Sequence, residues 1–238
     1  MVDASQPYNP LDRVELGKSV ERALLSRPLE PLPPERKFSG AGLYAIYYSG
    51  PYEAYAPIAP PCREAGEVPI YVGRARPKGA RQGVSEGLDV TTTDPVLYER
   101  LRQHARSIRQ VEEYGEKMGQ PTVRLSDFAC RYLVADDIWV PLGEALLIGH
   151  YRPLWNVVVD GFGNHAPGKG RSAQARSPWD ELHPGRGWAF RLPPPKASKH
   201  DILRHIEKHL SQLTLPDLAA TPDLDNEVRG ALEDQAES

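Results

Sequence analysis

Residues 40–50 read GAGLYAIYYSG, a run of strand-forming residues placed between glycines. In an extended strand successive side chains point to opposite faces, which separates Tyr44 and Tyr48 from Tyr47. Tyrosine is frequent in strands for reasons of packing alone. The stretch therefore predicts a strand over 42–49 and leaves open whether one of its tyrosines has a chemical role. For Tyr47 and Tyr48 packing is the favoured interpretation.

A second stretch, VPIYVG at 68–73, also has the composition of a strand and ends at a glycine. The segment between the two strands, 50–67, contains four prolines and predicts a long irregular loop. If the strands form an antiparallel hairpin, Tyr44 and Tyr71 come close in space although they are distant in the chain.

The composition is that of a globular protein that can bury a core. The chain has 238 residues, of which 40% are hydrophobic and 26% charged. Its two cysteines, Cys62 and Cys130, exclude a disulfide framework and a CxxC metal pair. No secretory signal and no apolar run of about 20 residues is visible. We expect a soluble, cytoplasmic protein without a membrane partner.

The charge is unevenly distributed along the chain. The net charge is −3, but the segment from Asp217 onward holds seven acidic residues against Arg229 alone. The rest of the chain is therefore net positive, with basic residues gathered in 74–109 and 169–208. A nucleic-acid backbone is attracted by the local charge of a protein surface, not by the net charge of the chain. Each basic stretch is equally well explained as a nucleic-acid contact or as a solvated surface.

Proline positions, caps and apolar periodicity predict the remaining elements. Helices are expected at 10–26, 94–114, 141–151 and 198–212, and further strands at 127–135 and 155–159. Arg100 and His104 are four residues apart and so lie on one face of their helix. Glu144 stands among leucines in the next helix, and Asn156 begins the last predicted strand.

Several other sites are excluded or weak. The chain has no GxGxxG motif, no phosphate-binding lysine loop and no GxSxG elbow. His205 and His209 share a helix face, but HIEKH lacks the order of a zinc protease motif, and a solvated face explains them better.

Taken in order, Gly42-Leu43-Tyr44, Tyr71-Val72-Gly73, the Arg100–His104 helix, Glu144 and Asn156 resemble the GIY-YIG nuclease family. The resemblance covers about 42–159. It implies an α+β fold, with a small antiparallel or mixed sheet flanked by helices.

The chain has more than the minimal family domain. We expect an N-terminal helix and proline-rich connector in 1–41 and a catalytic core in 42–160 with a DNA-contacting insertion at 74–93. A basic extension over 161–215 and an acidic, disordered tail over 216–238 would follow. This layout resembles the type II restriction endonuclease branch, which implies a homodimer.

The resemblance implies a metal-dependent hydrolysis of phosphodiester bonds. Glu144 would bind Mg²⁺, for which Mn²⁺ could substitute, because one carboxylate plus waters and phosphate suits that ion. Taken alone, Glu144 would point to solvent. Arg100 would neutralise the scissile phosphate, although it too could belong to a solvated helix face.

The implied roles of the other residues concern the attacking water. Tyr44 would orient or deprotonate it, which requires nearby cations to lower a phenol pKa of about 10. Tyr71 would contact the phosphate or the water shell, and His104 would bond the Tyr44 hydroxyl or relay its proton. Asn156 would brace the site, because an amide does not titrate.

Basic residues of the loops are candidates for contacts with DNA bases and phosphates. They are Arg74, Arg76, Lys78, Arg81, Lys169, Arg171 and Arg186. The cluster Trp179, Asp180 and His183 fits a DNA-facing role and a structural turn equally well.

The sequence thus predicts a Mg²⁺-dependent, sequence-specific endonuclease that acts on double-stranded DNA as a homodimer. A two-fold protein matches a palindromic site, and the resemblance suggests a GC-rich one, which the residues do not derive. The alternatives are a structure-specific or mobile-element nuclease and an inactive DNA-binding module.

Overall fold

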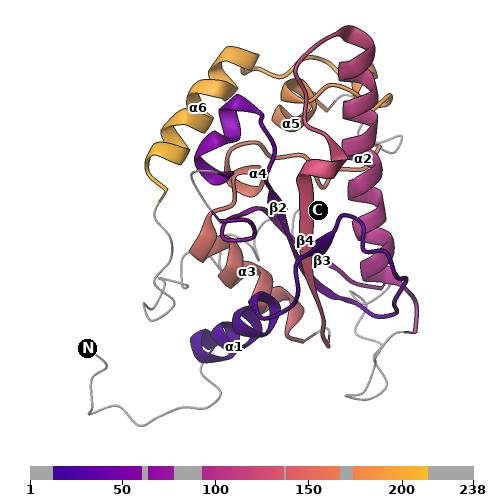
Figure 1. Ribbon diagram of the computed structural model, residues 1–238, viewed down its shortest axis with the longest axis vertical. Coiled ribbons are helices and arrows are strands. Elements are labelled where there is room, and N and C mark those ends of the chain that lie inside the picture. Colours follow the sequence, from indigo (N-terminus) through magenta and orange to yellow (C-terminus); the bar gives the residue numbers. More distant parts are fainter. Residues whose placement is uncertain (1–12, 61–63, 78–92, 137, 167–173, 214–238) are drawn as a thin grey trace.

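The computed structural model describes residues 13–60, 64–77, 93–136, 138–166 and 174–213. Its elements, in chain order, are α1 (Arg13–Leu25), β1 (Glu30–Pro31), β2 (Gly42–Tyr48), the 3₁₀ turn η1 (Glu53–Ile58), β3 (Pro69–Ala75), α2 (Val96–Met118), η3 (Leu125–Asp127), β4 (Phe128–Val134), α3 (Val140–Tyr151), α4 (Leu154–Val157), α5 (Pro178–Leu182), η5 (Ala189–Arg191) and α6 (Lys199–Ser211). Figure 1 shows the sheet at the centre, with helices around it.

The four strands form one antiparallel sheet in the order β1-β4-β2-β3. The predicted hairpin is confirmed, because β2 pairs with β3 and Tyr44 lies opposite Gly73. With helices beside an antiparallel sheet, the α+β fold class is also confirmed.

Helices cover both faces of the sheet, so β2 is buried along its whole length. One face carries Ala45 and Tyr47 and packs with residues of α1 and α3, such as Leu24 and Leu147. The other face holds the larger core, which includes Tyr44 and side chains from α2, α4, α5 and α6. The alternation of tyrosines expected from the sequence is therefore present, but neither face meets solvent.

Gly42 is required by the close approach of β2 to β4. A Cβ atom at this position would collide with the carbonyl oxygen of Leu133. The first residue of the GLY triplet is thus fixed by packing in the sheet, independently of any chemistry.

Two sequence predictions differ from the structure. The strand expected at 155–159 is wrong, because Leu154–Val157 forms the helical turn α4, which buries Trp155 and leaves Val157 exposed. Here tertiary packing overrides the strand preference of valine. The loop expected from Arg74 begins two residues later, because β3 continues to Ala75.

The segment predicted as a C-terminal extension packs directly on the sheet. Phe162, Trp179 and Ile202 belong to the same hydrophobic core as Tyr44 and Leu97. The acidic tail over 216–238 and the beginning of the helix expected at 10–26 lie outside the described residues. Among the helices described, none combines the length and apolar character that crossing a membrane requires.

Candidate active site

The β2–β3 hairpin and α2 bring three aromatic side chains of the predicted site together. The Tyr44 hydroxyl lies 2.6 Å from His104 Nε2, which is hydrogen-bonding distance. The ring centroids of Tyr44 and Tyr71 are 6.2 Å apart, and those of Tyr71 and His104 are 5.3 Å apart. Tyr44 and His104 are buried, whereas Tyr71 is partly exposed.

The glycine of the YVG triplet makes room for the Tyr44 ring. A Cβ atom at Gly73 would lie 2.6 Å from Tyr44 Cζ and 3.0 Å from Tyr71 Cε1, closer than real Cβ contacts. Any larger residue at this position would therefore push on both tyrosines at once.

Arg100 stands one helical turn before His104 and is half-buried. Its Nη2 donates to the carbonyl oxygen of Gly163 at 2.8 Å, and its Nη1 donates to His165 Nε2 at 2.7 Å. The guanidinium is therefore held in one orientation by the segment that follows α4.

Glu144 on α3 forms an ion pair with Arg74 on β3, with 3.0 Å between Glu144 Oε2 and Arg74 Nε. Burial raises the pKa of Glu144 to about 7, although Arg74 and Arg100 act in the opposite direction. The Nη1 atom of Arg74 is buried and has no hydrogen-bond partner among the described residues. A phosphate oxygen would satisfy this donor.

Asn156 braces the edge of the sheet next to the site. Its Oδ1 accepts from the Val72 N–H at 2.8 Å, and its Nδ2 donates to the Val72 carbonyl oxygen at 2.9 Å. β3 is an edge strand, so these backbone groups would otherwise lack a partner in the sheet. Asn156 thus fixes the strand that carries Tyr71 and Gly73.

Arg100 lowers the pKa of Tyr44, as expected of a nearby cation, but does not bring it below that of a free phenol. Burial raises the pKa of Tyr44 well above that of a free phenol, and this effect outweighs the opposing one of Arg100. Burial and the positive charge of Arg100 lower the pKa of His104 well below its usual range. The pair therefore consists of a neutral phenol and a neutral imidazole.

Arg186 is not on the surface, which contradicts its predicted DNA contact. Its side chain is 1% exposed and bonds Asp180 with both Nε and Nη2, at 2.6 Å and 2.7 Å. The predicted candidates Lys78, Arg81, Lys169 and Arg171 lie outside the described residues. Arg76 is half-buried at the end of β3.

The cluster of Trp179, Asp180 and His183 is buried, so the structural alternative holds for it. His183 Nε2 lies 2.5 Å from the Tyr55 hydroxyl, which also accepts from the indole N–H of Trp155 at 3.0 Å. Burial lowers the pKa of His183 to about 3, so the ring is neutral in this network.

Sequence reasoning missed three residues of the segment after α4. Phe162 stacks on His104 with ring centroids 4.4 Å apart, and Gly163 and His165 hold Arg100. A Cβ atom at Gly163 would lie 2.7 Å from the Tyr71 hydroxyl, so this glycine covers the site closely. The only local signal is the FGNH stretch itself, which resembles an ordinary turn.

The residues present fit one divalent cation that Glu144 would bind, with water and substrate phosphate as its remaining ligands. The described parts of the chain contain no group of three His, Cys, Asp or Glu side chains that could hold a metal. Glu144 is the acidic residue that acts on both Tyr44 and Tyr71, because its charge raises the pKa of each. A cation beside this buried carboxylate would favour its ionised form.

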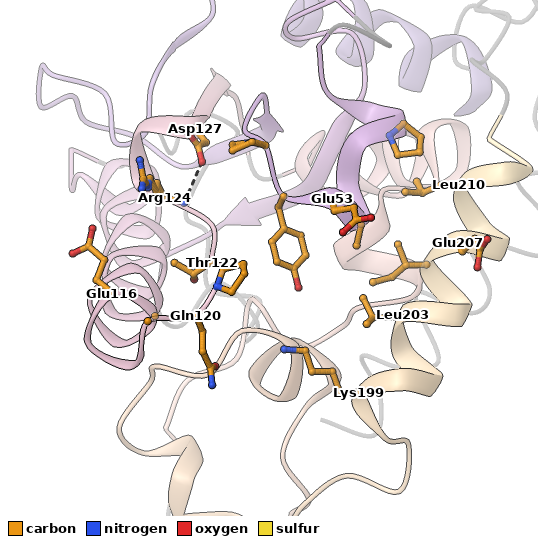
Figure 2. A pocket seen from close by; sticks show the side chains of 18 of the residues that line it. Glu53, Glu116, Gln120, Thr122, Arg124, Asp127, Lys199, Leu203, Glu207 and Leu210 are labelled. Atoms are coloured by element: carbon orange, nitrogen blue, oxygen red, sulfur yellow. Dashed lines mark hydrogen bonds between the residues drawn. The ribbon is translucent and has the colours of Figure 1, made fainter.

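A groove of about 1440 Å³ lies away from these residues, between η1, the end of α2 and α6. Figure 2 shows Leu203 and Glu207 of α6 opposite Thr122 and Gln120 across it. None of the residues assembled above is among the described residues that line this groove.

A family model described as "Eco29kI GIY-YIG domain" matches residues 36–210, well over half of the chain. The match includes both tyrosine triplets, α2 and α3, and it continues through the segment after α4 into the last turn of α6. A comparison with curated proteins finds no match. The resemblance drawn from the sequence is thereby confirmed.

Proposed function

Because this chain belongs to the Eco29kI GIY-YIG family, a restriction endonuclease family of GIY-YIG nucleases, we propose that it is a Mg²⁺-dependent, site-specific endonuclease of double-stranded DNA. The observation that carries the proposal is the assembly of Tyr44, His104 and Arg100 beside the Glu144–Arg74 ion pair. Phosphodiester hydrolysis needs charge stabilisation at the phosphate and an acceptor for the proton of water, and these residues can supply both.

The phosphate would be bound by arginines. Arg100 and Arg74 are both half-buried, and the Nη1 atom of Arg74, which has no partner in the described part of the chain, would donate to a phosphate oxygen. Tyr71, also partly exposed, would donate its hydroxyl to the phosphate or to bound water. The substrate would thus meet donors from β3 and α2 together.

The proton of the attacking water would pass through Tyr44 to His104. The raised pKa of Tyr44 disfavours a free phenolate, so the phenol must lose its own proton as it takes one. His104 Nε2, 2.6 Å away and neutral, is placed to accept that proton, and the negative charge of a bound phosphate would oppose the low pKa of its imidazole. The water oxygen then bonds to phosphorus while the leaving oxygen departs.

Glu144 would bind the Mg²⁺ ion, with Mn²⁺ as a possible substitute, and water and phosphate would complete the coordination. When bound, such an ion stabilises the negative charge that develops on the phosphate. Glu144 must then exchange its contact with Arg74 for the ion, which would free Arg74 for the phosphate.

We further propose that the enzyme acts as a homodimer on a palindromic site, since two-fold protein symmetry matches two-fold DNA symmetry. The basic residues Arg76, Lys78, Arg81, Lys169 and Arg171 are proposed to contact the DNA, while Arg186 is excluded from this set by its burial.

The test is to incubate purified protein with a long natural DNA and Mg²⁺ and to separate the products on a gel. Discrete bands are the expected result. A smear would indicate nonspecific cutting and would refute the site specificity. Intact but shifted DNA would refute the nuclease activity and identify a DNA-binding module.

A further inference from the structure

The buried guanidinium of Arg186 uses all five of its N–H groups. Two of them bind the carboxylate of Asp180, through Nε at 2.6 Å and Nη2 at 2.7 Å. The other three bind backbone carbonyl oxygens of one segment: Gly161 at 2.8 Å, Phe162 at 3.1 Å and Asn164 at 3.0 Å. Every donor therefore has an acceptor, and three of the five acceptors belong to the segment after α4.

The surroundings of Arg186 hold the guanidinium plane in place. The guanidinium makes cation–π contacts with Trp179 and Trp188, whose ring centroids are 4.5 Å and 4.7 Å from Arg186 Cζ. Asp180 also accepts from the Ser177 hydroxyl at 2.6 Å, which fixes the carboxylate. Two aromatic rings and a bound carboxylate leave this side chain a single arrangement.

A buried ion pair of this kind is poorly explained by stability alone. Moving both charges out of water is costly, and well-packed apolar residues of similar volume often stabilise a protein as much or more. What apolar residues cannot do is bind three carbonyl oxygens in a defined order. The arrangement is thus better suited to fixing the shape of residues 161–164 than to adding stability.

The opposite side of the same segment touches the candidate active site at three points. The carbonyl oxygen of Gly163 accepts from Arg100 Nη2 at 2.8 Å. The Phe162 ring stacks on His104 at an interplanar angle of 21°. Gly163 also lies against the Tyr71 hydroxyl, so closely that a Cβ atom would not fit.

We propose that Arg186, together with Asp180, is a positioning residue of the active site: it fixes the segment 161–165, and that segment holds Arg100 and His104 in their working orientation. Arg186 acts through the segment and does not touch the substrate. The inference rests on the proposed nuclease function, because the orientation matters for phosphodiester hydrolysis. It gives the region after α4 a role in the chemistry, which the five sequence motifs do not include.

The experiment measures single-turnover cleavage and DNA affinity for the full-length protein and for the variant Arg186→Ala. A displacement of about 1 Å at reacting groups costs about 100-fold in rate, so a loss of this order is expected. DNA affinity should change far less, because the phosphate-contacting donors remain. Millimolar guanidinium chloride should restore part of the rate by entering the space between Trp179 and Trp188, whereas sodium chloride at the same concentration should not.

The matched control is Tyr55→Phe. It removes a buried hydroxyl that bonds His183 and Trp155 in the same aromatic core, but it leaves the carbonyl contacts of Arg186 intact. This variant should unfold at a lower temperature, cut at the wild-type rate and show no response to guanidinium. If Arg186 has only a structural role, Arg186→Ala will behave like Tyr55→Phe: each variant will be less stable, but its folded form will cut at the wild-type rate. That result would overturn the proposal.

Two further variants keep the inference testable if Arg186→Ala does not fold. Asp180→Asn retains the shape of the acceptor, and Arg186→Lys retains the charge without the planar fork. Both should lose cleavage rate by at least about 10-fold while remaining folded, because small misplacements have large effects on rate. Wild-type cleavage rates in both variants would refute the positioning role and leave the proposed nuclease function intact. If the wild-type protein itself cuts no DNA, the proposed function is refuted and this inference with it.

Discussion

Gly73→Ala tests the packing of the site through a single methyl group. The added Cβ would lie 2.6 Å from Tyr44 Cζ and 3.0 Å from Tyr71 Cε1, where ordinary contacts begin at 3.4 Å. Tyr44 cannot move away easily, because its ring has no exposed surface and its hydroxyl is bonded to His104.

Overpacking of this kind costs about 1–3 kcal/mol. In a domain of this size each kcal/mol lowers the melting temperature by about 2–4 °C, so a fall of roughly 2–12 °C is expected. Any relief gained by shifting Tyr44 lengthens its bond to His104, and the single-turnover cleavage rate should then fall about 100-fold.

The assay is thermal unfolding followed by circular dichroism, combined with single-turnover cleavage of one DNA fragment. Gly187→Ala is the matched control, because a Cβ atom there has no neighbour within 4 Å. The control should keep its melting temperature or raise it by up to about 4 °C, since an unstrained Gly→Ala change stabilises by less than about 1 kcal/mol. If Gly73→Ala melts with the control and cuts at the wild-type rate, the arrangement of Tyr44 under Gly73 is wrong.

Three further changes have defined outcomes. Tyr44→Phe removes only the hydroxyl that faces His104, so cleavage should slow by about 100-fold or more while DNA binding persists, and undiminished cleavage would reduce Tyr44 to a packing residue. Asn156→Leu leaves the Val72 N–H and carbonyl without partners, which should cost about 2–4 kcal/mol in chemical denaturation; an unchanged midpoint would argue against this brace. His183 has a pKa of about 3 in the folded protein against about 6.5 when unfolded, so its contribution to stability is complete above pH 6.5 and is lost as the pH falls toward 3, at up to about 1.4 kcal/mol per pH unit. Denaturation of His183→Gln should therefore be less sensitive to pH over this range than that of the wild type, and equal slopes would contradict the neutral imidazole.

The hairpin and the tyrosine pair could be predicted because their signals are local. Gly42 and Gly73 are explained by close approaches within the sheet, and the alternation along β2 follows from strand geometry. The Arg100–His104 pair likewise follows from helical spacing alone. These features need only short-range rules and the order of the motifs.

What failed depends on contacts between distant parts of the chain. Arg186 stands between glycines in a polar stretch, and nothing local indicates that Asp180 and three carbonyl groups will bury it. The valines after Trp155 favour a strand, yet α4 forms because Trp155 enters the core and Asn156 reaches Val72. The pairing of Arg74 with Glu144 likewise has no local signal, since the ion pair joins two separate elements.

The measurement that tests the central claim most directly is single-turnover cleavage by Glu144→Gln in the presence of Mg²⁺, with DNA affinity measured in parallel. This change keeps the size of the side chain and removes only the charge that would bind the ion. The account predicts that the variant binds DNA like the wild type and cuts at least about 1,000-fold more slowly, as expected when metal stabilisation of several kcal/mol is lost. Cleavage within a few-fold of the wild-type rate would show that the site around Tyr44, Arg100 and Glu144 is not where the DNA is cut.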